Sequence, residues 1–263
     1  METSKKNLNI YGSGPAGLAA ALYAVRSGLD VTVFETSAFG GKLNEIPSLD
    51  NFPGFPGGPG RDLANSEIKK LKSLGVKFAY SDTDKTLSPA DAILLATGTV
   101  PKKLDFTPVP PVSYCALCDA PLYRDKSVAV VGSGNSAASG ALYLSDLASS
   151  VTIFANSDLR AEPATLSALE KKSNIKIEKV LATEENTKDF AAVFVFIGHT
   201  PASSMLEPAL LDEKGYVKTD ETHRVKDNIF AAGSVRSGVL DQCITSAADG
   251  AAAAVDIINF LKQ

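Results

Sequence analysis

The sequence lacks the features of a membrane, nucleic-acid-binding or exported protein. No apolar run in its 263 residues approaches the about 20 that a membrane-spanning helix needs. Its 26 Lys and Arg are outnumbered by 30 Asp and Glu, so it has no excess of positive charge for nucleic acid. The first ten residues, METSKKNLNI, show neither an apolar leader nor a cleavage site. We therefore expect a cytoplasmic protein that binds neither membranes nor nucleic acid.

Cysteine and histidine are also scarce. Three cysteines are too few for a disulfide-stapled scaffold, and in a cytoplasmic chain they indicate redox or metal chemistry. Cys115 and Cys118 form a C-x-x-C pair, which is also half of a zinc motif. The sequence holds no second such pair, and its two histidines are His199 and His223, so disulfide chemistry is favoured and we predict no metal. His199, in a Gly-His-Thr-Pro turn, is interpreted as structural and His223 as a surface residue.

An internal repeat is the most informative feature that is present. Residues 8–35 and 128–155 each read as an apolar strand, a glycine-rich turn, a helix and a second strand, and they align without a gap. A second echo pairs residues 93–101 with residues 194–202. The repeat predicts an α/β protein with two nested Rossmann-like domains, each with three layers (ββα/βαβ) around a mostly parallel sheet.

The order of the segments predicts that the first domain is discontinuous. The second copy of the repeat follows a proline-rich hinge at 106–112. The tail then supplies a strand, IFAAG, and an alanine-rich helix at about 241–261, which we expect to complete the first domain. That domain is therefore predicted to consist of residues 1–108 and 200–263, and the second domain of residues 109–199.

The first glycine-rich turn, Gly12-Ser-Gly-Pro-Ala-Gly17, lies between a strand and a helix, as a dinucleotide-binding turn does. Gly12 permits the tight turn, Gly14 lets the backbone approach a pyrophosphate, and Gly17 lets the helix pack closely on the strand. The helix N-terminus favours the negative charge. Glu35 ends the second strand, where a carboxylate can accept the hydroxyls of an adenosine ribose. A turn that binds nothing is the less favoured alternative.

The second turn, residues 132–137, keeps the glycines but not the groups that recognise a ribose. The position equivalent to Glu35 is Ala155, followed by Asn156 and Ser157, and the first cation is Arg160. An NAD site needs a carboxylate at this strand end, and an NADP site needs arginines. A purely architectural role of the second domain is therefore slightly favoured over nucleotide binding.

The C-x-x-C pair with the following Asp119 is the candidate reaction centre. Its spacing allows a disulfide if Cys115 lies at a helix start. A helix N-terminus favours the thiolate, which is the nucleophile in disulfide exchange, and an adjacent carboxyl can move protons. Cys243, a lone thiol at the start of a helix of small residues, is interpreted as a buried packing residue.

The segments YGSGPAGLAAALYA, GGKL, NFPG, ATG, SYCALCDAPLYRDKSVAVVGSGNSA, FIGHTP, IFAAG and DQCITSAADGAAAA, in this order, resemble the low-molecular-weight thioredoxin reductase family of flavoproteins. The resemblance covers essentially the whole chain. It implies an enzyme, commonly a two-fold homodimer, that binds FAD and reduces a thioredoxin-like protein. It further implies that Cys118 accepts electrons from the flavin, that Cys115 attacks the partner's disulfide and that Asp119 is the acid/base.

The resemblance also implies a set of FAD-binding residues. Those at 40–43 would approach the flavin and ribityl chain, and those at 242–243 would lie beside the pyrimidine end of the ring. The full set is Gly12, Ser13, Gly14, Pro15, Ala16, Gly17, Phe34, Glu35, Gly40, Gly41, Lys42, Leu43, Asn51, Ala96, Thr97, Gly98, Gly233, Ser234, Gln242 and Cys243.

The chain departs from the family where NADPH would bind. The NADPH-dependent members have His-Arg-Arg where this chain has Ala155-Asn156-Ser157. Ser234 replaces the aspartate of the C-terminal FAD motif, which removes an acceptor for a ribityl hydroxyl, and Asp241 replaces an arginine. The strands expected between residues 78 and 90, and between 179 and 191, are largely trimmed. These departures favour the ferredoxin-dependent flavin thioredoxin reductases, with ferredoxin as electron donor.

Three alternatives stay open. The first is an NADPH-dependent thioredoxin reductase with a degenerate nucleotide site. The second is a flavin disulfide oxidoreductase or oxidase that acts on a small molecule. The third is a non-catalytic flavin- or nucleotide-binding module that keeps the fold as an interaction scaffold, which the intact C-x-x-C-D sequence disfavours.

Overall fold

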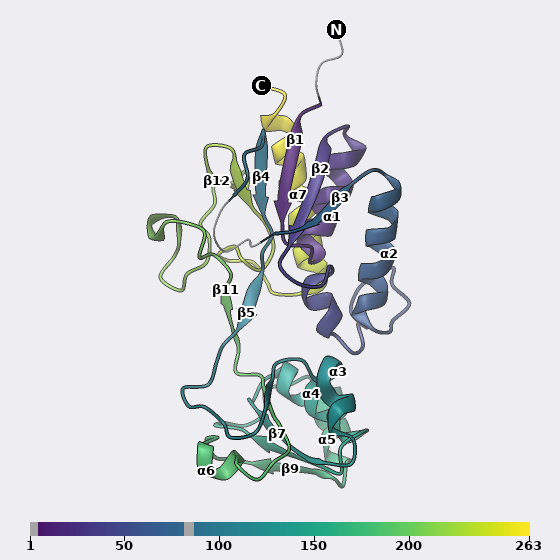
Figure 1. Cartoon of the computed structure of the whole chain (residues 1–263), viewed down its shortest axis with the longest axis vertical. Coiled ribbons are helices and arrows are strands. Elements are labelled where there is room, and N and C mark those ends of the chain that lie inside the picture. The colour runs from purple at the N-terminus through teal and green to yellow at the C-terminus, as the bar shows by residue number, and fades with distance from the viewer. Residues whose placement is uncertain (1–4, 82–86) are drawn as a thin grey trace. The chain divides into compact units, whose positions relative to one another are not determined.

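The computed structural model describes residues 5–81 and 87–263 (Figure 1). Residues 1–4 and 82–86 lie outside the described residues, so the expectations about a leader and about a trimmed strand between 78 and 90 fall partly there. The chain divides into two compact units. Unit 1 consists of Met1–Val100 and Thr200–Gln263, and unit 2 of Pro101–His199.

The chain passes from unit 1 to unit 2 in strand β5 (Thr99–Pro101) and returns in β11 (His199–Pro201), and these two strands form a small sheet. Unit 2 therefore starts at residue 101, whereas the sequence placed its start at 109. The reason is packing that composition does not reveal. Leu104 already contacts an apolar core of unit 2, and the Lys102 N–H donates a hydrogen bond to the carbonyl of Gly198 at 2.9 Å.

A six-stranded sheet, in the order β12-β13-β4-β1-β2-β3, forms the centre of unit 1. Strands β13, β4, β1, β2 and β3 run parallel, and β12 is antiparallel to β13. Ile229 of β13 pairs with Ile93 of β4, so the two segments of unit 1 share one sheet. The strands are β1 (Asn7–Tyr11), β2 (Asp30–Glu35), β3 (Lys77–Tyr80), β4 (Ala92–Leu95), β12 (Arg224–Lys226) and β13 (Ile229–Ala231).

Helices cover one face of this sheet, and irregular segments cover the other. Alternate strand residues such as Leu8 and Ile10 pack against α1 (Pro15–Arg26), α2 (Gly60–Ser73) and α7 (Cys243–Phe260). The intervening Tyr11, Ile93 and Leu95 pack against residues of the 206–235 segment on the opposite face. Two 3₁₀ helices complete unit 1, η1 (Gly41–Glu45) and η3 (Pro208–Leu210).

Unit 2 contains a five-stranded parallel sheet in the order β6-β10-β7-β8-β9. Its main core lies between this sheet and helices α4 and α5, around Phe194 and Leu144. The strands are β6 (Val112–Ser113), β7 (Ser127–Val131), β8 (Ser150–Phe154), β9 (Ile175–Glu178) and β10 (Val193–Val195). The helices are α3 (Ala116–Asp119), η2 (Ala120–Tyr123), α4 (Asn135–Ser145), α5 (Pro163–Glu170) and α6 (Glu184–Thr187).

The predicted α/β fold with two Rossmann-like sheets is confirmed, and the repeat is visible in the backbone. Gly12 follows β1 with φ +104°, and Gly132 follows β7 with φ +143°. A Cβ on Gly12 would lie 2.2 Å from the Ala96 carbonyl oxygen, and one on Gly132 would lie 2.2 Å from that of Phe196. Both turns therefore require glycine for the same reason. Among residues 5–81 and 87–263, no helix is both long and apolar enough to cross a membrane.

Candidate functional site

The predicted cofactor-binding residues of unit 1 follow the carboxyl ends of four neighbouring parallel strands. The turn at 12–17 follows β1, Glu35 ends β2, residues 96–98 follow β4, and residues 233–234 lie just after β13. Because parallel strands end at the same edge of their sheet, the fold brings these segments together. This edge is the usual place for a ligand in an open α/β sheet.

The turn between β1 and α1 forms an open cradle. A Cβ on Gly17 would lie 1.9 Å from the carbonyl oxygen of Gly12, so helix and turn are in close contact there. At Gly14 the added Cβ would have no atom of the described residues within 4 Å. Pro15 starts the helix, and its missing N–H costs nothing at this position. Open backbone at a helix N-terminus is suited to a pyrophosphate, so this turn fits the diphosphate of a dinucleotide.

Ser13 connects three parts of the cradle. This residue is fully buried, and its N–H and hydroxyl both donate to one carboxylate oxygen of Glu35, at 3.0 and 2.6 Å. The same hydroxyl accepts the N–H of Gly40 at 2.9 Å. The second oxygen of Glu35 accepts the Thr36 N–H at 2.9 Å. Glu35 is thereby held beside the turn, where it was expected from the sequence.

The loop at 40–43 lies against the cradle. A Cβ on Gly41 would be 3.1 Å from the Cα of Gly14, which places these two backbones in contact. The ammonium of Lys42 hydrogen-bonds to the Thr99 hydroxyl and lies 3.5 Å from a carboxylate oxygen of Asp241. Leu43 is buried in the core of unit 1.

Asn51 and Gln242 meet at the start of α7, whereas Thr97 contacts the segment that follows β11. The amide of Asn51 donates to the side-chain oxygen of Gln242 at 3.1 Å, across 191 residues of sequence. The Thr97 hydroxyl donates to the carbonyl of Ala202 at 2.6 Å. Cys243 is half-buried against the apolar core, as expected for a packing residue, and burial raises the pKa of its thiol to about 11. Cys243 therefore stays a neutral thiol near neutral pH.

Two predicted residues have visible packing roles. The ring of Phe34 stacks on Tyr11 with 5.0 Å between ring centroids, beneath the end of β2. The hydroxyl of Ser234 lies 3.5 Å from the position that a Cβ of Gly98 would take, so these two loops are neighbours. Gly233 has φ +77°, and its N–H is held by Asp249 at 2.7 Å.

Asp249 belongs to a cluster that the sequence did not reveal. It accepts two hydrogen bonds from Arg236, at 3.1 and 2.8 Å, besides that of the Gly233 N–H. His223 lies between Asp249 and Asp256, at 3.2 and 2.7 Å. The side chain of His223 is 12% exposed, so its interpretation as a surface residue is wrong. Its partners lie on α7, far along the chain, and no local pattern around Thr222 or Arg224 indicates them.

The charges of this cluster shift the pKa values of its members in opposite directions. The hydrogen bond to Asp249 raises the pKa of His223, against the effect of its burial, and Asp256 adds to the rise. Burial tends to raise the pKa of Asp249, but the hydrogen bonds from His223, Gly233 and Arg236 outweigh it and lower the pKa. The cluster therefore favours a charged His223 beside a charged Asp249.

The reaction centre predicted in unit 2 is a disulfide. Cys115 and Cys118 are bonded, with 5.3 Å between their Cα atoms. Cys115 precedes α3, and Cys118 is the more exposed of the two. Asp119 ends the same helical turn, and its carboxylate accepts a hydrogen bond from the Ser113 hydroxyl at 2.7 Å. Sequence reasoning missed Ser113, because a serine two residues before a cysteine is no recognised motif.

The second glycine-rich turn is contacted by the segment after β8. The Arg160 N–H donates to the Ser133 carbonyl at 2.7 Å, and the Ser157 hydroxyl donates to the Ser133 hydroxyl at 3.2 Å. Ala155, which stands where Glu35 stands in unit 1, is fully buried, whereas Asn156 is exposed. The strand end thus presents hydroxyl and amide groups in place of a carboxylate or arginines.

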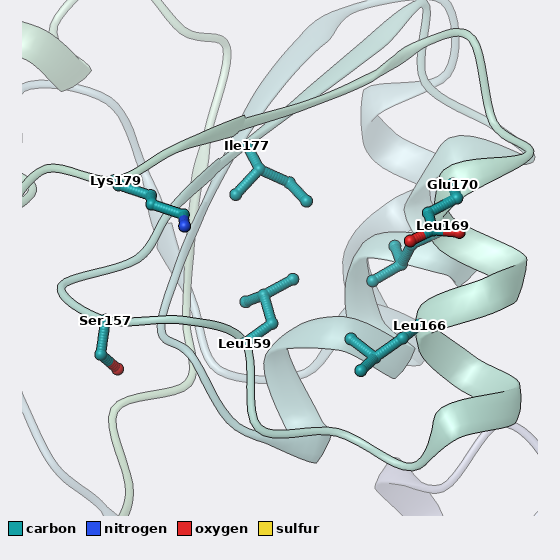
Figure 2. Close-up of a pocket in the computed structure, with 7 residues that line it drawn as sticks. All are labelled: Ser157, Leu159, Leu166, Leu169, Glu170, Ile177 and Lys179. Atoms are coloured by element: carbon teal, nitrogen blue, oxygen red, sulfur yellow. The ribbon is translucent and has the colours of Figure 1, made fainter.

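A shallow pocket of about 200 Å³ opens nearby in unit 2. Figure 2 shows that apolar side chains from the loop after β8, from α5 and from β9 face a common space, with Lys179 and Glu170 near its edge. None of its seven described lining residues is an arginine, the side chain that binds phosphate in a bidentate way. The pocket therefore does not supply the missing phosphate anchors. The apolar residues are Leu159, Leu166, Leu169 and Ile177.

Comparison with known proteins places these features in context. Residues 6–250 match the pyridine nucleotide-disulphide oxidoreductase family. The thioredoxin reductase of Borreliella burgdorferi is 31% identical, over 99% of this chain and 97% of its own. The crystal structure of Lactococcus lactis thioredoxin reductase has a TM-score of 0.87 and 29% identity, over 98% and 99% of the two chains. That of a ferredoxin-flavin thioredoxin reductase from Clostridium acetobutylicum has a TM-score of 0.53 and 26% identity, over 98% of both chains.

Proposed function

Because the chain belongs to the pyridine nucleotide-disulphide oxidoreductase family, and within it to the thioredoxin reductases, we propose that it reduces a thioredoxin-like protein through Cys115 and Cys118. It is a flavin-dependent disulfide oxidoreductase with FAD as its cofactor. The single observation that carries the proposed role of the cysteines is their disulfide, formed beside Asp119 at a helical turn.

We assign FAD to unit 1 and disulfide exchange to unit 2. The open backbone at Gly14 would hold the pyrophosphate, and Glu35 would accept the hydroxyls of the adenosine ribose. The loop at 40–43 and the Asn51–Gln242 pair would contact the flavin end of the cofactor. The positions of Ser13 and Glu35 favour this assignment, since hydrogen bonds within the protein orient both side chains beside the turn.

When bound and reduced by its electron donor, FAD would supply the electron pair that, together with two protons, opens the Cys115–Cys118 disulfide to a dithiol. Asp119 takes the proton of Cys115, whose thiolate then attacks the partner's disulfide and forms a mixed disulfide with one of its sulfurs. The other partner sulfur leaves with the electron pair of the broken bond, and Asp119 gives it a proton. Asp119 next takes the proton of Cys118, whose thiolate attacks Cys115, restores the disulfide and releases the second partner thiolate. The dithiol is oxidised by two electrons and the partner disulfide is reduced by two.

We propose ferredoxin rather than NADPH as the electron donor. The end of β8 offers Ala155, Asn156 and Ser157, and these side chains cannot pair with a 2′-phosphate as arginines do. The solved ferredoxin-flavin thioredoxin reductase, at 26% identity, is a relative whose donor fits this loss. The ferredoxin partner, the homodimer and the cytoplasmic location stay predictions.

Stopped-flow mixing under anaerobic conditions tests the donor. Ferredoxin kept reduced by its own reductase should bleach the flavin absorbance band, and NADPH should leave it unchanged. Rapid bleaching by NADPH would replace this proposal with the NADPH-dependent alternative. Steady oxygen consumption with a small dithiol, and no reduction of thioredoxin, would favour the oxidase.

The cysteines are tested by Cys118→Ser. This variant should keep its FAD and lose the reduction of thioredoxin, because the mixed disulfide on Cys115 can no longer be resolved. Ser145→Ala, which removes a buried hydroxyl on α4, is the matched control and should keep full activity. Full activity of Cys118→Ser would instead support the non-catalytic alternative.

A further inference from the structure

The hydroxyl of Ser113 lies between the carboxylate of Asp119 and the backbone of Cys115. Ser113 ends β6 and is only 4% exposed. Its Oγ is 2.7 Å from Oδ2 of Asp119. The same oxygen is 3.2 Å from the carbonyl oxygen of Cys115 and 3.1 Å from the Cys115 amide nitrogen. All of these atoms belong to unit 2 and to one short stretch of chain, so the contacts do not depend on any other part of the molecule.

One hydroxyl hydrogen has two acceptors within reach. A serine hydroxyl has one hydrogen to donate and two lone pairs to accept with. The Cys115 N–H occupies one lone pair, which leaves the hydrogen and one lone pair for the remaining contacts. The hydrogen can therefore be directed either to the carboxylate of Asp119 or to the carbonyl of Cys115.

These two arrangements match the two protonation states of Asp119. When the carboxylate is ionised, it accepts the Ser113 hydrogen. When it is protonated, its own O–H donates to the free lone pair of Ser113, and the Ser113 hydrogen turns to the carbonyl of Cys115. In both states each hydroxyl hydrogen of the group has an acceptor, and the Cys115 carbonyl also accepts the Asp119 N–H at 3.2 Å. This matters because Ser113 is buried, where a donor without an acceptor is costly.

We propose that Ser113 is a positioning residue that keeps Asp119 hydrogen-bonded in both of its protonation states during disulfide exchange. This inference rests on the proposed function, in which Asp119 gives a proton to the sulfur that leaves the partner's disulfide. As that proton moves, the Ser113 hydrogen turns from the Cys115 carbonyl to the new carboxylate. Because Ser113 also accepts a hydrogen bond from the Cys115 N–H, the carboxylate of Asp119 keeps its position relative to the backbone of the attacking cysteine.

Two disulfide substrates separate this role from a structural one. The FAD-containing protein is reduced with dithiothreitol, desalted without oxygen and mixed with one disulfide in a single turnover. Bis(2-hydroxyethyl) disulfide releases a basic alkyl thiolate that needs a proton, whereas 5,5′-dithiobis(2-nitrobenzoate) releases a stable aryl thiolate that does not. Ser113→Ala should slow the alkyl reaction about tenfold, the scale of a lost hydrogen bond to a charged group, and leave the aryl reaction within about twofold.

Matched variants make the result specific. Ser145→Ala removes another buried hydroxyl of unit 2, whose 2.7 Å bond goes to the Leu142 carbonyl, and should change neither rate. Ser113→Thr restores a hydroxyl and should restore the alkyl rate. Asp119→Asn should lower the same rate, and adding Ser113→Ala to it should then have no further effect.

The outcomes are distinguishable. Equal slowing of both reactions by Ser113→Ala would show a structural role, and an unchanged alkyl rate would show no role; either result overturns the inference. An added loss in the Asp119→Asn background would also overturn it, because Ser113 would then act without Asp119. If the reduced wild-type protein does not reduce oxidised thioredoxin in the same single-turnover assay, the proposed function itself fails.

Discussion

At the scale of single residues, Gly12 and Gly14 have different tasks in the same turn. Gly12 has φ +104°, and its Cβ would overlap the Ala96 carbonyl at 2.2 Å. Gly14 has φ −69°, which suits any residue, and its Cβ would meet no atom of the described residues within 4 Å. Gly12 is therefore needed for folding, whereas Gly14 keeps a surface open.

We expect Gly12→Ala and Gly14→Ala to fail in different ways. Gly12→Ala should destabilise the protein by about 3 kcal/mol or more, through backbone strain and overlap, and lower its melting temperature. Gly14→Ala should melt like the wild type without cofactor but bind FAD at least about tenfold more weakly, since its methyl group would stand where the pyrophosphate approaches. Thermal unfolding of the apoprotein and titration with FAD measure both effects. If Gly14→Ala binds FAD as tightly as the wild type, the pyrophosphate does not bind at this turn.

His223 gives the stability of unit 1 a defined pH dependence. Its pKa is raised in the folded protein, chiefly by the hydrogen bond to Asp249, so its contribution is complete below the unfolded value of about 6.5 and is lost as the pH rises through the folded value. His223→Gln should therefore lower the melting temperature more at pH 6 than at pH 9. Asp249 has the opposite sign, because its lowered pKa gives a contribution that is lost only in acid.

Melting curves across this pH range, with Lys77→Gln as the control, check the prediction. Lys77 forms an exposed ion pair with Asp30 at 2.9 Å and involves no histidine, the residue type that ordinarily changes its charge in this pH range. The control should therefore show the same small change at both pH values. If the melting temperature of His223→Gln falls further below that of the wild type as the pH rises, the assignment of a charged His223 is contradicted.

Residue types at fixed spacing were predictable from sequence, and pairings between distant segments were not. Glycine at positions 12 and 132, the Cys115–Cys118 pair and the carboxylate of Glu35 each have a local signature. The contact of His223 with Asp249 has none, because a histidine between polar neighbours reads as exposed until α7 is packed on it. Ser113 was missed for a related reason, since its role depends on the direction of one hydroxyl.

At the scale of elements, α1 and α7 pack closely against each other in unit 1. A Cβ on Gly250 of α7 would lie 2.0 Å from the carbonyl oxygen of Ala16 in α1. Gly233 adds a similar constraint, with its Cβ 2.7 Å from the Ala16 side chain. Contact with α1 therefore explains Gly250, one of the small residues of this alanine-rich helix.

Gly250→Ala should consequently destabilise the protein although alanine is the better helix former. The change favours the helix by about 1 kcal/mol, but overpacking against α1 costs about 1–3 kcal/mol or more. Ser66→Ala, at an exposed position of α2, has the helix preference without the overlap and should keep or slightly raise the melting temperature. If the melting temperature rises equally in Gly250→Ala and Ser66→Ala, α1 and α7 are not in close contact at Gly250.

The sequence predicts the long elements, whose apolar residues recur at a regular spacing, but it does not predict the short strands. The pattern of residues 8–35 predicts β1, α1 and β2, and a helix at about 241–261 is observed as Cys243–Phe260. Strands of two or three residues, such as β6 and β12, show no period that a sequence could display. They form because neighbouring strands offer backbone partners, which is non-local information.

At the scale of the whole molecule, the two units share one βαβ arrangement but differ in the side chains that could bind a nucleotide. Unit 1 keeps both the glycine-rich turn and the acid of Glu35. Unit 2 keeps the turn, with φ +143° at Gly132, but has Ala155 at the equivalent position. Its predicted loss of NADPH binding is therefore a loss of anchoring side chains rather than of backbone geometry.

If only the anchors are missing, restoring them should restore binding of the phosphate. Asn156 and Ser157 are exposed, so Asn156→Arg with Ser157→Arg can be introduced without disturbing the core. Two guanidinium groups can bind a 2′-phosphate through charge-assisted hydrogen bonds of about 1.5–3 kcal/mol each, so calorimetry should show at least a tenfold gain in affinity for adenosine 2′,5′-bisphosphate. Adenosine 5′-monophosphate, which lacks the 2′-phosphate, should gain much less. No gain, or an equal gain for both ligands, would mean that the turn itself no longer accepts a nucleotide.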